Sequence, residues 1–298
     1  MKRVKVLITG AAGFIGSKLE ELFLLRGYDV IGWDRINTKN IVSIDMTDEI
    51  AVKEMLDQSK PDLVIHCAGS ADVGKSVKYP EMDFIGNVSL THNLLFSLHK
   101  LQMNNTKFVF LSSASVYGNP KTLPITEDMP LNPLSPYALH KVMCEDICRY
   151  FYDNYNMEIK IARIFSAYGA GLRKQIFWDM YQKAERTGRL EMFGSGKESR
   201  DYIHVNDVIQ SLYLIATKDS DNMIFNVANG EETTIRKATE LFADYAGIDR
   251  EKIIFSGHVR EGDPINWRAD ISRIQALGYK KSIDLEDGIK DYVHWVEN

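Results

Sequence analysis

Short apolar runs rich in β-branched residues alternate with amphipathic stretches through the first half of this chain, and this alternation limits the fold more than any other feature. The apolar runs predict buried strands at Val4–Thr9, Asp29–Trp33, Leu63–Cys67, Phe108–Ser112 and Ile159–Ile164. The stretches between them predict helices over Ile15–Arg26, Ile50–Gln58, Phe84–Leu101 and Pro136–Tyr155. Strand–helix–strand crossovers are right-handed, so this order predicts an α/β fold with a doubly wound parallel sheet. Ligands are expected beyond the carboxyl ends of its strands.

The alternation becomes irregular from about Tyr168, where glycines separate shorter elements. We therefore expect two parts, residues 1–165 with the sheet and residues 166–298 as a smaller C-terminal α/β lobe, with some later segments returning to the first part. The chain has 298 residues, which is enough for one large α/β unit with two lobes around a sizeable core.

Charge and apolar patterning exclude several classes of partner. With 36 Lys+Arg against 41 Asp+Glu, the net charge of −5 gives no overall positive field for nucleic acid or an anionic membrane surface. No run approaches the roughly 18 apolar residues of a membrane span, and the N-terminus has no signal-peptide pattern, so a cytoplasmic location is expected. Three cysteines fit a reducing compartment; Cys144 and Cys148 share a helical face without further ligands, so they predict packing and no metal site.

A glycine-rich turn joins the first predicted strand to the first predicted helix. It is Gly10-Ala-Ala-Gly13-Phe14-Ile15-Gly16, and it brings backbone and a helix N-terminus close to where a pyrophosphate can bind. Asp34 ends the second strand, where an acidic residue binds the adenosine ribose of a dinucleotide. The segment therefore predicts a Rossmann dinucleotide site. Asp34 favours NAD because it would repel a 2′-phosphate, while the neighbouring Arg35 keeps NADP open.

A tyrosine and a lysine lie one turn apart in the helix that Ser135 and Pro136 begin. The spacing Tyr137-x-x-x-Lys141 puts both side chains on one face. An ammonium group near a phenol stabilises the phenolate, which makes the tyrosine usable as a general acid and base. The strand ending in Ser112 and Ser113 places hydroxyls at the sheet edge where a substrate is expected.

These motifs together resemble the extended short-chain dehydrogenase/reductases, and among them the NAD-dependent nucleotide-sugar epimerase/dehydratase family, over nearly the whole chain. The resemblance implies that Ser113, Tyr137 and Lys141 are catalytic. Cofactor contacts are implied for Gly10, Gly13, Phe14, Ile15, Gly16, Asp34, Arg35, Asp45, Met46, Cys67, Ala68, Gly69, Ser112, Tyr137, Lys141 and Phe165. Contacts with a nucleoside-diphosphate sugar are implied for Ser113, Ser166, Gln175, Arg200 and Arg260. The family also implies a homodimer that pairs the Phe84–Leu101 and Tyr137 helices.

The leading functional hypothesis is a nucleoside-diphosphate-hexose 4-epimerase that works through a transient 4-keto sugar with retained NAD. The alternative is a 4-keto-6-deoxysugar reductase supplied with NADPH or NADH, which Arg35 favours slightly. Ala71 favours it too, because bacterial UDP-galactose epimerases carry an NAD-retaining lysine there. A 4,6-dehydratase is disfavoured, since Ala114 and Ser115 replace the Asp-Glu pair of such enzymes. A non-catalytic nucleotide sensor would be expected to lack Tyr137 or Lys141. The sequence does not identify the base or the hexose.

Overall fold

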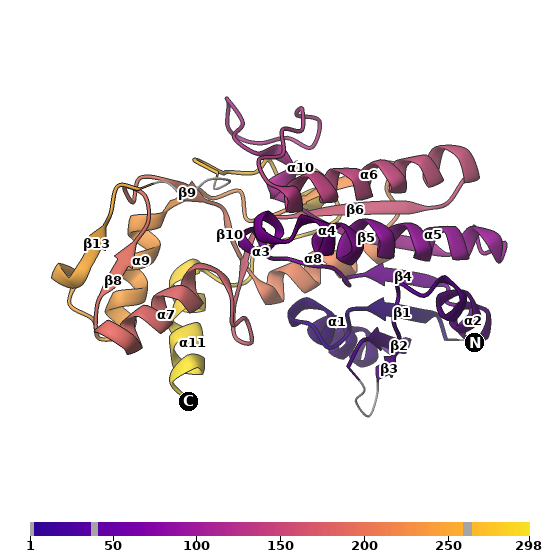
Figure 1. The fold of residues 1–298 in the computed structure, drawn as a ribbon, viewed down its shortest axis with the longest axis horizontal. Coiled ribbons are helices and arrows are strands. Elements are labelled where there is room, and N and C mark those ends of the chain that lie inside the picture. Colours follow the sequence, from indigo (N-terminus) through magenta and orange to yellow (C-terminus); the bar gives the residue numbers. More distant parts are fainter. Residues whose placement is uncertain (1–2, 37–40, 259–263) are drawn as a thin grey trace.

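The computed structural model describes residues 3–36, 41–258 and 264–298, and in them a seven-stranded sheet is the central element. The strand order is β11-β6-β5-β4-β1-β2-β3, and every neighbouring pair is parallel. Figure 1 labels β1 to β6 of this sheet. The strands are β1 (Lys5–Thr9), β2 (Asp29–Asp34), β3 (Ile41–Ser43), β4 (Leu63–His66), β5 (Lys107–Ser113), β6 (Ile159–Ile164) and β11 (Ile224–Val227). The order runs outward in both directions from β1 and β4, so the predicted doubly wound α/β fold is confirmed.

Helices cover both faces of this sheet because apolar side chains point to both sides of each strand. Val6 and Ile8 of β1 lie in one core cluster, together with residues of α1 (Phe14–Leu25) and α8 (Val205–Thr217). Leu7, between them, belongs to a second cluster on the other face. That cluster contains residues of α2 (Glu49–Ser59), α5 (Leu90–Lys100) and α6 (Pro136–Tyr155). Helices therefore cover both faces of the sheet, and a ligand can reach it only at the ends of the strands.

The prediction of one continuous helix over Phe84–Leu101 is wrong. The chain forms α3 (Val73–Lys78), α4 (Pro80–Phe84), a π-helical turn η1 (Ile85–Ser89) and then α5. Within η1 the Asn87 side-chain amide donates to the carbonyl of Asp83 at 3.1 Å, which offers the backbone a local alternative to the regular ladder. Periodicity alone does not reveal such a turn, because η1 keeps the chain helical on both sides.

The second lobe lies beside the sheet (Figure 1). It has a core of its own that combines aliphatic and aromatic side chains. Its long helices are α7 (Gln175–Thr187), α9 (Ile235–Tyr245) and α11 (Leu285–Glu297). Its strands pair as β7 (Ser166–Tyr168) with β10 (Tyr202–His204), β8 (Leu190–Met192) with β13 (Ile253–Phe255), and β9 (Ser199–Arg200) with β12 (Thr233–Thr234). Short helical segments complete the chain: η2 (Ala114–Tyr117), η3 (Arg250–Lys252) and α10 (Ser272–Ala276).

Elements from the second half of the sequence pack with the first. Strand β11 extends the large sheet beside β6, and α8 lies against α1 and the same face of the sheet. Helix α10 adds Ile274 to the core on that face. Among the residues described, no helix has the length and apolar character needed to cross a membrane.

Candidate active site

The glycine-rich turn forms a cradle in which side chains have no room. Gly10 has φ +67°, and a Cβ placed on it would lie 2.7 Å from the backbone nitrogen of Ala68. A Cβ on Gly16 would lie 2.1 Å from the carbonyl oxygen of Gly10. Helix α1 follows with Gly13 as its N-cap, and no side chain caps the first-turn amides of Phe14 and Ile15. The cradle fits a dinucleotide, because these amides and the positive end of the helix dipole suit a pyrophosphate.

Asp34 is fixed toward this cradle from the end of β2. Its Oδ2 accepts the Ala12 amide at 3.0 Å, and its Oδ1 accepts the Arg35 amide at 2.7 Å. Asp34 is half-buried and Arg35 is exposed, so both lie where the sequence placed a ribose contact. Asp45 is exposed, and hydrogen bonds from the Thr47 hydroxyl and amide lower the pKa of its carboxyl. Met46 beside it is buried in the core.

The turn after β4 closes the other side of the cradle. The amide of Cys67 donates to the Thr9 carbonyl at 3.1 Å, and the amide of Ala68 donates to the Thr9 hydroxyl at 3.1 Å. Gly69 follows, and a Cβ there would lie 2.8 Å from Asn87 Oδ1 and 3.5 Å from Lys141 Nζ. The β4 turn thus connects the glycine cradle to the helix that carries Lys141.

The predicted catalytic residues lie at the carboxyl end of β5 and the first turns of α6. Ser135 caps α6 by accepting the Ala138 amide, and Pro136 occupies the first helical position. Lys141 Nζ donates to the Leu111 carbonyl at 3.0 Å and lies 5.9 Å from the centre of the Tyr137 ring. Both side chains are nearly buried, with 9% of Tyr137 and 6% of Lys141 exposed. Lys141 is therefore held beside Tyr137 and under the end of β5.

Ser113 ends β5 as a half-buried residue. Its Oγ accepts the amide of Ser115 at 3.2 Å, so its hydroxyl proton is left to donate elsewhere. Ser112, predicted as a cofactor contact, donates its hydroxyl to Glu145 in the interior at 2.5 Å. Phe165 is buried, with its ring 5.7 Å from that of Trp267.

The predicted sugar-nucleotide residues come from the second lobe and its junction. Arg200 donates from Nη1 to the carbonyls of Ser199 and Ile265, and its guanidinium lies 5.7 Å from the centre of the Trp267 ring. Ser166 begins β7, where its amide donates to the Asp201 carbonyl. Gln175 begins α7 as an exposed residue with φ +63°. Arg260 lies outside the described residues.

Three side chains that the sequence did not single out contact this machinery. Ser76 of α3 accepts the Tyr137 amide at 3.1 Å. Glu145 of α6 binds Ser112, and Trp267 packs on Arg200 and Phe165. Glu145 follows Lys141 by four residues, so helical spacing was a usable signal. The contacts of Ser76 and Trp267 join distant segments and leave no local pattern.

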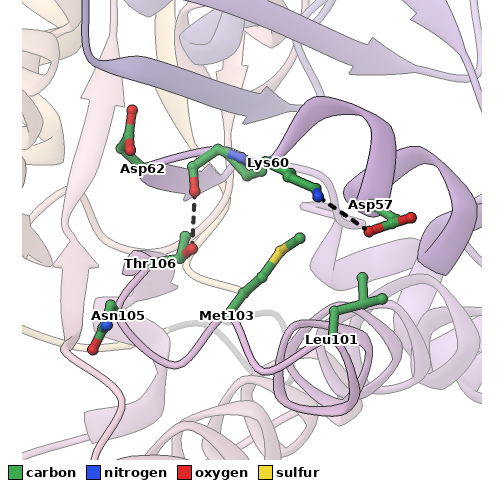
Figure 2. A pocket seen from close by; sticks show the side chains of 8 residues that line it. Asp57, Lys60, Asp62, Leu101, Met103, Asn105 and Thr106 are labelled. Atoms are coloured by element: carbon green, nitrogen blue, oxygen red, sulfur yellow. Dashed lines mark hydrogen bonds and ion pairs between the residues drawn. The ribbon is translucent and has the colours of Figure 1, made fainter. Parts of the chain in front are cut away.

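A hollow of about 290 Å³ lies at the amino ends of the strands, opposite to the site described above. Figure 2 shows the side chains that line it. Pro61 and Asp62 line it just before β4, and Thr106 lines it just before β5. The hydroxyl of Thr106 donates to the Pro61 carbonyl, and Lys60 pairs with Asp57. This hollow is at the amino ends of the strands, so it is separate from the site. Within the described part of the chain, no cluster of His, Cys, Asp or Glu could hold a metal ion.

Comparisons with known proteins agree with this geometry. Residues 6–228 match the model of the NAD dependent epimerase/dehydratase family. The UDP-glucose 4-epimerase of Mycolicibacterium smegmatis is 30% identical over 319 residues, covering 99% of each chain. A Thermotoga maritima UDP-glucose 4-epimerase solved with UDP-glucose has a TM-score of 0.91 at 27% identity and 99% coverage of both chains. A Bacillus cereus UDP-glucuronic acid 4-epimerase solved with UDP-glucuronic acid and NAD has a TM-score of 0.87 at 26% identity, again covering 99% of both. The chain therefore belongs to the NAD dependent epimerase/dehydratase family.

Proposed function

We propose that this protein is a nucleoside-diphosphate-hexose 4-epimerase that retains NAD and acts through a transient 4-keto sugar. The observation that carries the proposal is the placement of Ser113, Tyr137 and Lys141 at the sheet edge that also holds the glycine cradle. The similar proteins named above are 4-epimerases of UDP-sugars, and this makes uridine diphosphate the first nucleotide to test. They give no support to the ketoreductase alternative.

Each catalytic side chain has one task in this scheme. Tyr137 removes the proton of the sugar C4 hydroxyl and returns it after the keto sugar has turned over. Lys141, anchored on the Leu111 carbonyl, stabilises the phenolate by its charge. Ser113 donates its hydroxyl proton to the reacting sugar oxygen. NAD, when bound, supplies the acceptor and later the donor of the C4 hydride, so no net oxidation occurs.

The two residues after Ser113 provide neither an acid nor a base for dehydration at C4–C6. Ala114 is fully buried, and Ser115 carries only a hydroxyl. Neither side chain exchanges a proton readily at neutral pH. The site therefore supports hydride and proton exchange at C4 and not elimination.

The substrate diphosphate is assigned to Arg200, with Arg260 as the second predicted contact. A guanidinium binds phosphate oxygens through two parallel hydrogen bonds, which suits a diphosphate in a chain of net charge −5. Ser166 and Gln175 belong to the same proposed site, at the start of β7 and of α7.

The decisive test combines cofactor release with turnover. Purified protein should release about one equivalent of NAD on denaturation and should interconvert UDP-glucose and UDP-galactose without consuming added NADH or NADPH. UDP-glucuronic acid and UDP-N-acetylglucosamine complete the panel. A protein that binds no dinucleotide and oxidises NADPH against a 4-keto sugar would refute the epimerase and support the reductase.

We also propose a homodimer formed through α6 and the neighbouring helices. Leu139, Met143 and Tyr150 lie on one side of α6 with 43%, 39% and 54% of each residue exposed, and Phe84 and Ile85 are exposed nearby. Such a patch favours burial against a second copy. Sedimentation should give a dimer that Met143→Glu weakens; a wild-type monomer at micromolar concentration would contradict this. The cytoplasmic location stays a prediction from the sequence.

A further inference from the structure

An ion pair is buried directly beneath the catalytic helix. Glu145 of α6 is 0% exposed and Arg163 of β6 is 2% exposed. Arg163 Nη2 donates to Glu145 Oε2 at 2.6 Å, and Arg163 Nε donates to Glu145 Oε1 at 3.0 Å. This is a bidentate pair, the arrangement with the most restrictive geometry for the two groups.

The pair is connected to the catalytic residues from the Glu145 side. Glu145 follows Lys141 by four residues and Tyr137 by eight, so the three side chains share one face of α6. Glu145 Oε1 also accepts the hydroxyl of Ser112 at 2.5 Å. Ser112 directly precedes Ser113, so one carboxylate holds the helix of the general acid and base against the strand of the substrate-binding hydroxyl.

The Arg163 side is fixed just as firmly. Arg163 Nη1 donates to the Tyr117 hydroxyl at 2.8 Å and to the Glu127 carbonyl at 2.9 Å. Tyr117 in turn donates to Asn226 Oδ1 at 2.7 Å, and that residue belongs to β11. The guanidinium is therefore held by Tyr117 of η2 and by the Glu127 carbonyl as well as by Glu145, and Tyr117 links it to β11. These contacts fix the guanidinium from elements other than α6.

Stability alone is a poor reason for such a pair. Removing two charges from water is costly, and well-packed apolar replacements of buried ion pairs are often neutral or stabilising. Catalysis, in contrast, is sensitive to displacements of about 1 Å between reacting groups. A bidentate pair limits such displacements because its attraction depends on geometry.

We propose that Glu145 and Arg163 are positioning residues, whose pairing sets α6 against β5 and so fixes the distance of Tyr137 and Lys141 from Ser113. The chemistry that they serve is the epimerisation proposed above. They touch neither substrate nor cofactor and act through Ser112 and through the backbone of α6.

The test is the double variant Glu145→Met/Arg163→Met, which removes both charges and leaves flexible apolar side chains. We expect stoichiometric NAD and an unchanged KM for the nucleotide sugar, with kcat per folded protein lowered about 10- to 100-fold. The melting temperature should fall as well, because the Ser112 hydroxyl and the Glu127 carbonyl each lose a hydrogen-bond partner. Amides of the first turns of α6 should exchange with deuterium faster than in the wild type. A residue that only supports folding would lower the melting temperature and leave kcat per folded protein unchanged.

Lys160→Met is the matched control. Lys160 is a buried cation of the same strand, but it lies at the far end of β6 and donates to the carbonyls of Ser220 and Asn222. Its removal should leave kcat and exchange in α6 unchanged.

Two results would overturn the proposal. One is a folded double variant with wild-type kcat and wild-type exchange in α6. If the double variant does not fold, Ser112→Ala decides, since it removes only the hydroxyl that links Glu145 to β5: unchanged kcat and exchange would refute the role. Absence of UDP-hexose epimerisation in the wild type would refute the proposed function instead, and the exchange measurement would still decide the positioning role.

Discussion

Gly16 is a residue at which one added methyl group should abolish cofactor binding. A Cβ there would lie 2.1 Å from the Gly10 carbonyl oxygen, so Gly16→Ala must push the turn away from α1. We expect no NAD in the purified variant and no turnover. Gly74→Ala is the control, because its Cβ has an ordinary contact of 3.7 Å with Asp72 Oδ1. NAD quantified after denaturation checks this, and stoichiometric NAD in Gly16→Ala would show that the cradle is elsewhere.

Tyr137 tests the proton path at the same scale. Tyr137→Phe keeps the ring and loses the hydroxyl, so epimerisation should fall by about 100- to 10,000-fold, the usual contribution of a positioned acid or base. Dinucleotide binding should persist. Tyr152→Phe, at an exposed position of the same helix, should have wild-type kcat. Appreciable epimerisation by Tyr137→Phe would assign the proton transfer to another group.

The patterns that predict these residues are local in the sequence. The need for glycine at Gly16 arises within one turn, and the pairing of Tyr137 with Lys141 arises within one helical turn. The close approach of Ala68 to Gly10, in contrast, exists only after β4 has packed beside β1. The partners of Tyr137 and Glu145 in the interior were not predictable in this way. Ser76 meets the Tyr137 amide, and Arg163 meets Glu145, only after α3, α6 and β6 have packed.

At the scale of elements, α6 begins and ends at the residues that the sequence predicts, Pro136 and Tyr155. The Ser135 cap and the proline define its start, and Asn156 in the left-handed conformation ends it. Strands β3 and β11 were not predicted. β3 has only three residues, and β11 lies in the half where the alternation of strand and helix is interrupted. Short strands are stabilised by their neighbours in the sheet, which sequence periodicity does not show.

His66 is buried where β1, β4 and α5 meet, and it makes the stability of the protein depend on pH. His66 Nδ1 meets the Thr9 hydroxyl at 2.7 Å and Nε2 meets the Thr91 hydroxyl at 3.2 Å. Burial, with a smaller effect of the Lys141 charge, lowers the pKa of His66 to about 3. The folded state therefore holds this ring neutral, while the unfolded chain binds a proton below about pH 6.5. Its contribution is present above pH 6.5 and is lost as pH falls toward 3.

When the pH is lowered from 6.5 to 5, His66 should reduce the free energy of unfolding by about 2 kcal/mol. Urea unfolding at a series of pH values measures the effect. His66→Gln keeps a donor and an acceptor but does not titrate. Between pH 6.5 and 5 its free energy of unfolding should therefore fall by about 2 kcal/mol less than that of the wild type. His294→Gln, at an exposed position of α11, should follow the wild type. Equal pH slopes in His66→Gln and wild type would contradict the assignment.

At the scale of the whole molecule, the cofactor cradle and the proposed sugar-nucleotide site come from different lobes. The cradle belongs to the β1–α1 turn, and Arg200 belongs to β9 of the second lobe. The lobes are not separate stretches of sequence, because β11 and α8 return to the large sheet. The strand pairs of the second lobe could not be predicted from the sequence, since each strand contains only two or three residues.

Because the two sites lie in different lobes, we expect a change at Arg200 to weaken binding of the sugar nucleotide and to leave binding of NAD unchanged. Arg200→Met should weaken binding of UDP and UDP-glucose by about 10- to 100-fold, because a hydrogen bond to a charged group contributes about 1.5–3 kcal/mol. The rise in melting temperature that saturating UDP causes in the wild type should shrink accordingly, since a ligand stabilises only as far as it binds the folded state. NAD content should not change. Arg250→Met removes the same charge from an exposed pair with Asp244 and controls for the net charge of the protein. If Arg200→Met binds UDP as tightly as Arg250→Met does, the diphosphate lies away from β9, and the assignment of the second lobe to the sugar nucleotide would have to rest on other residues.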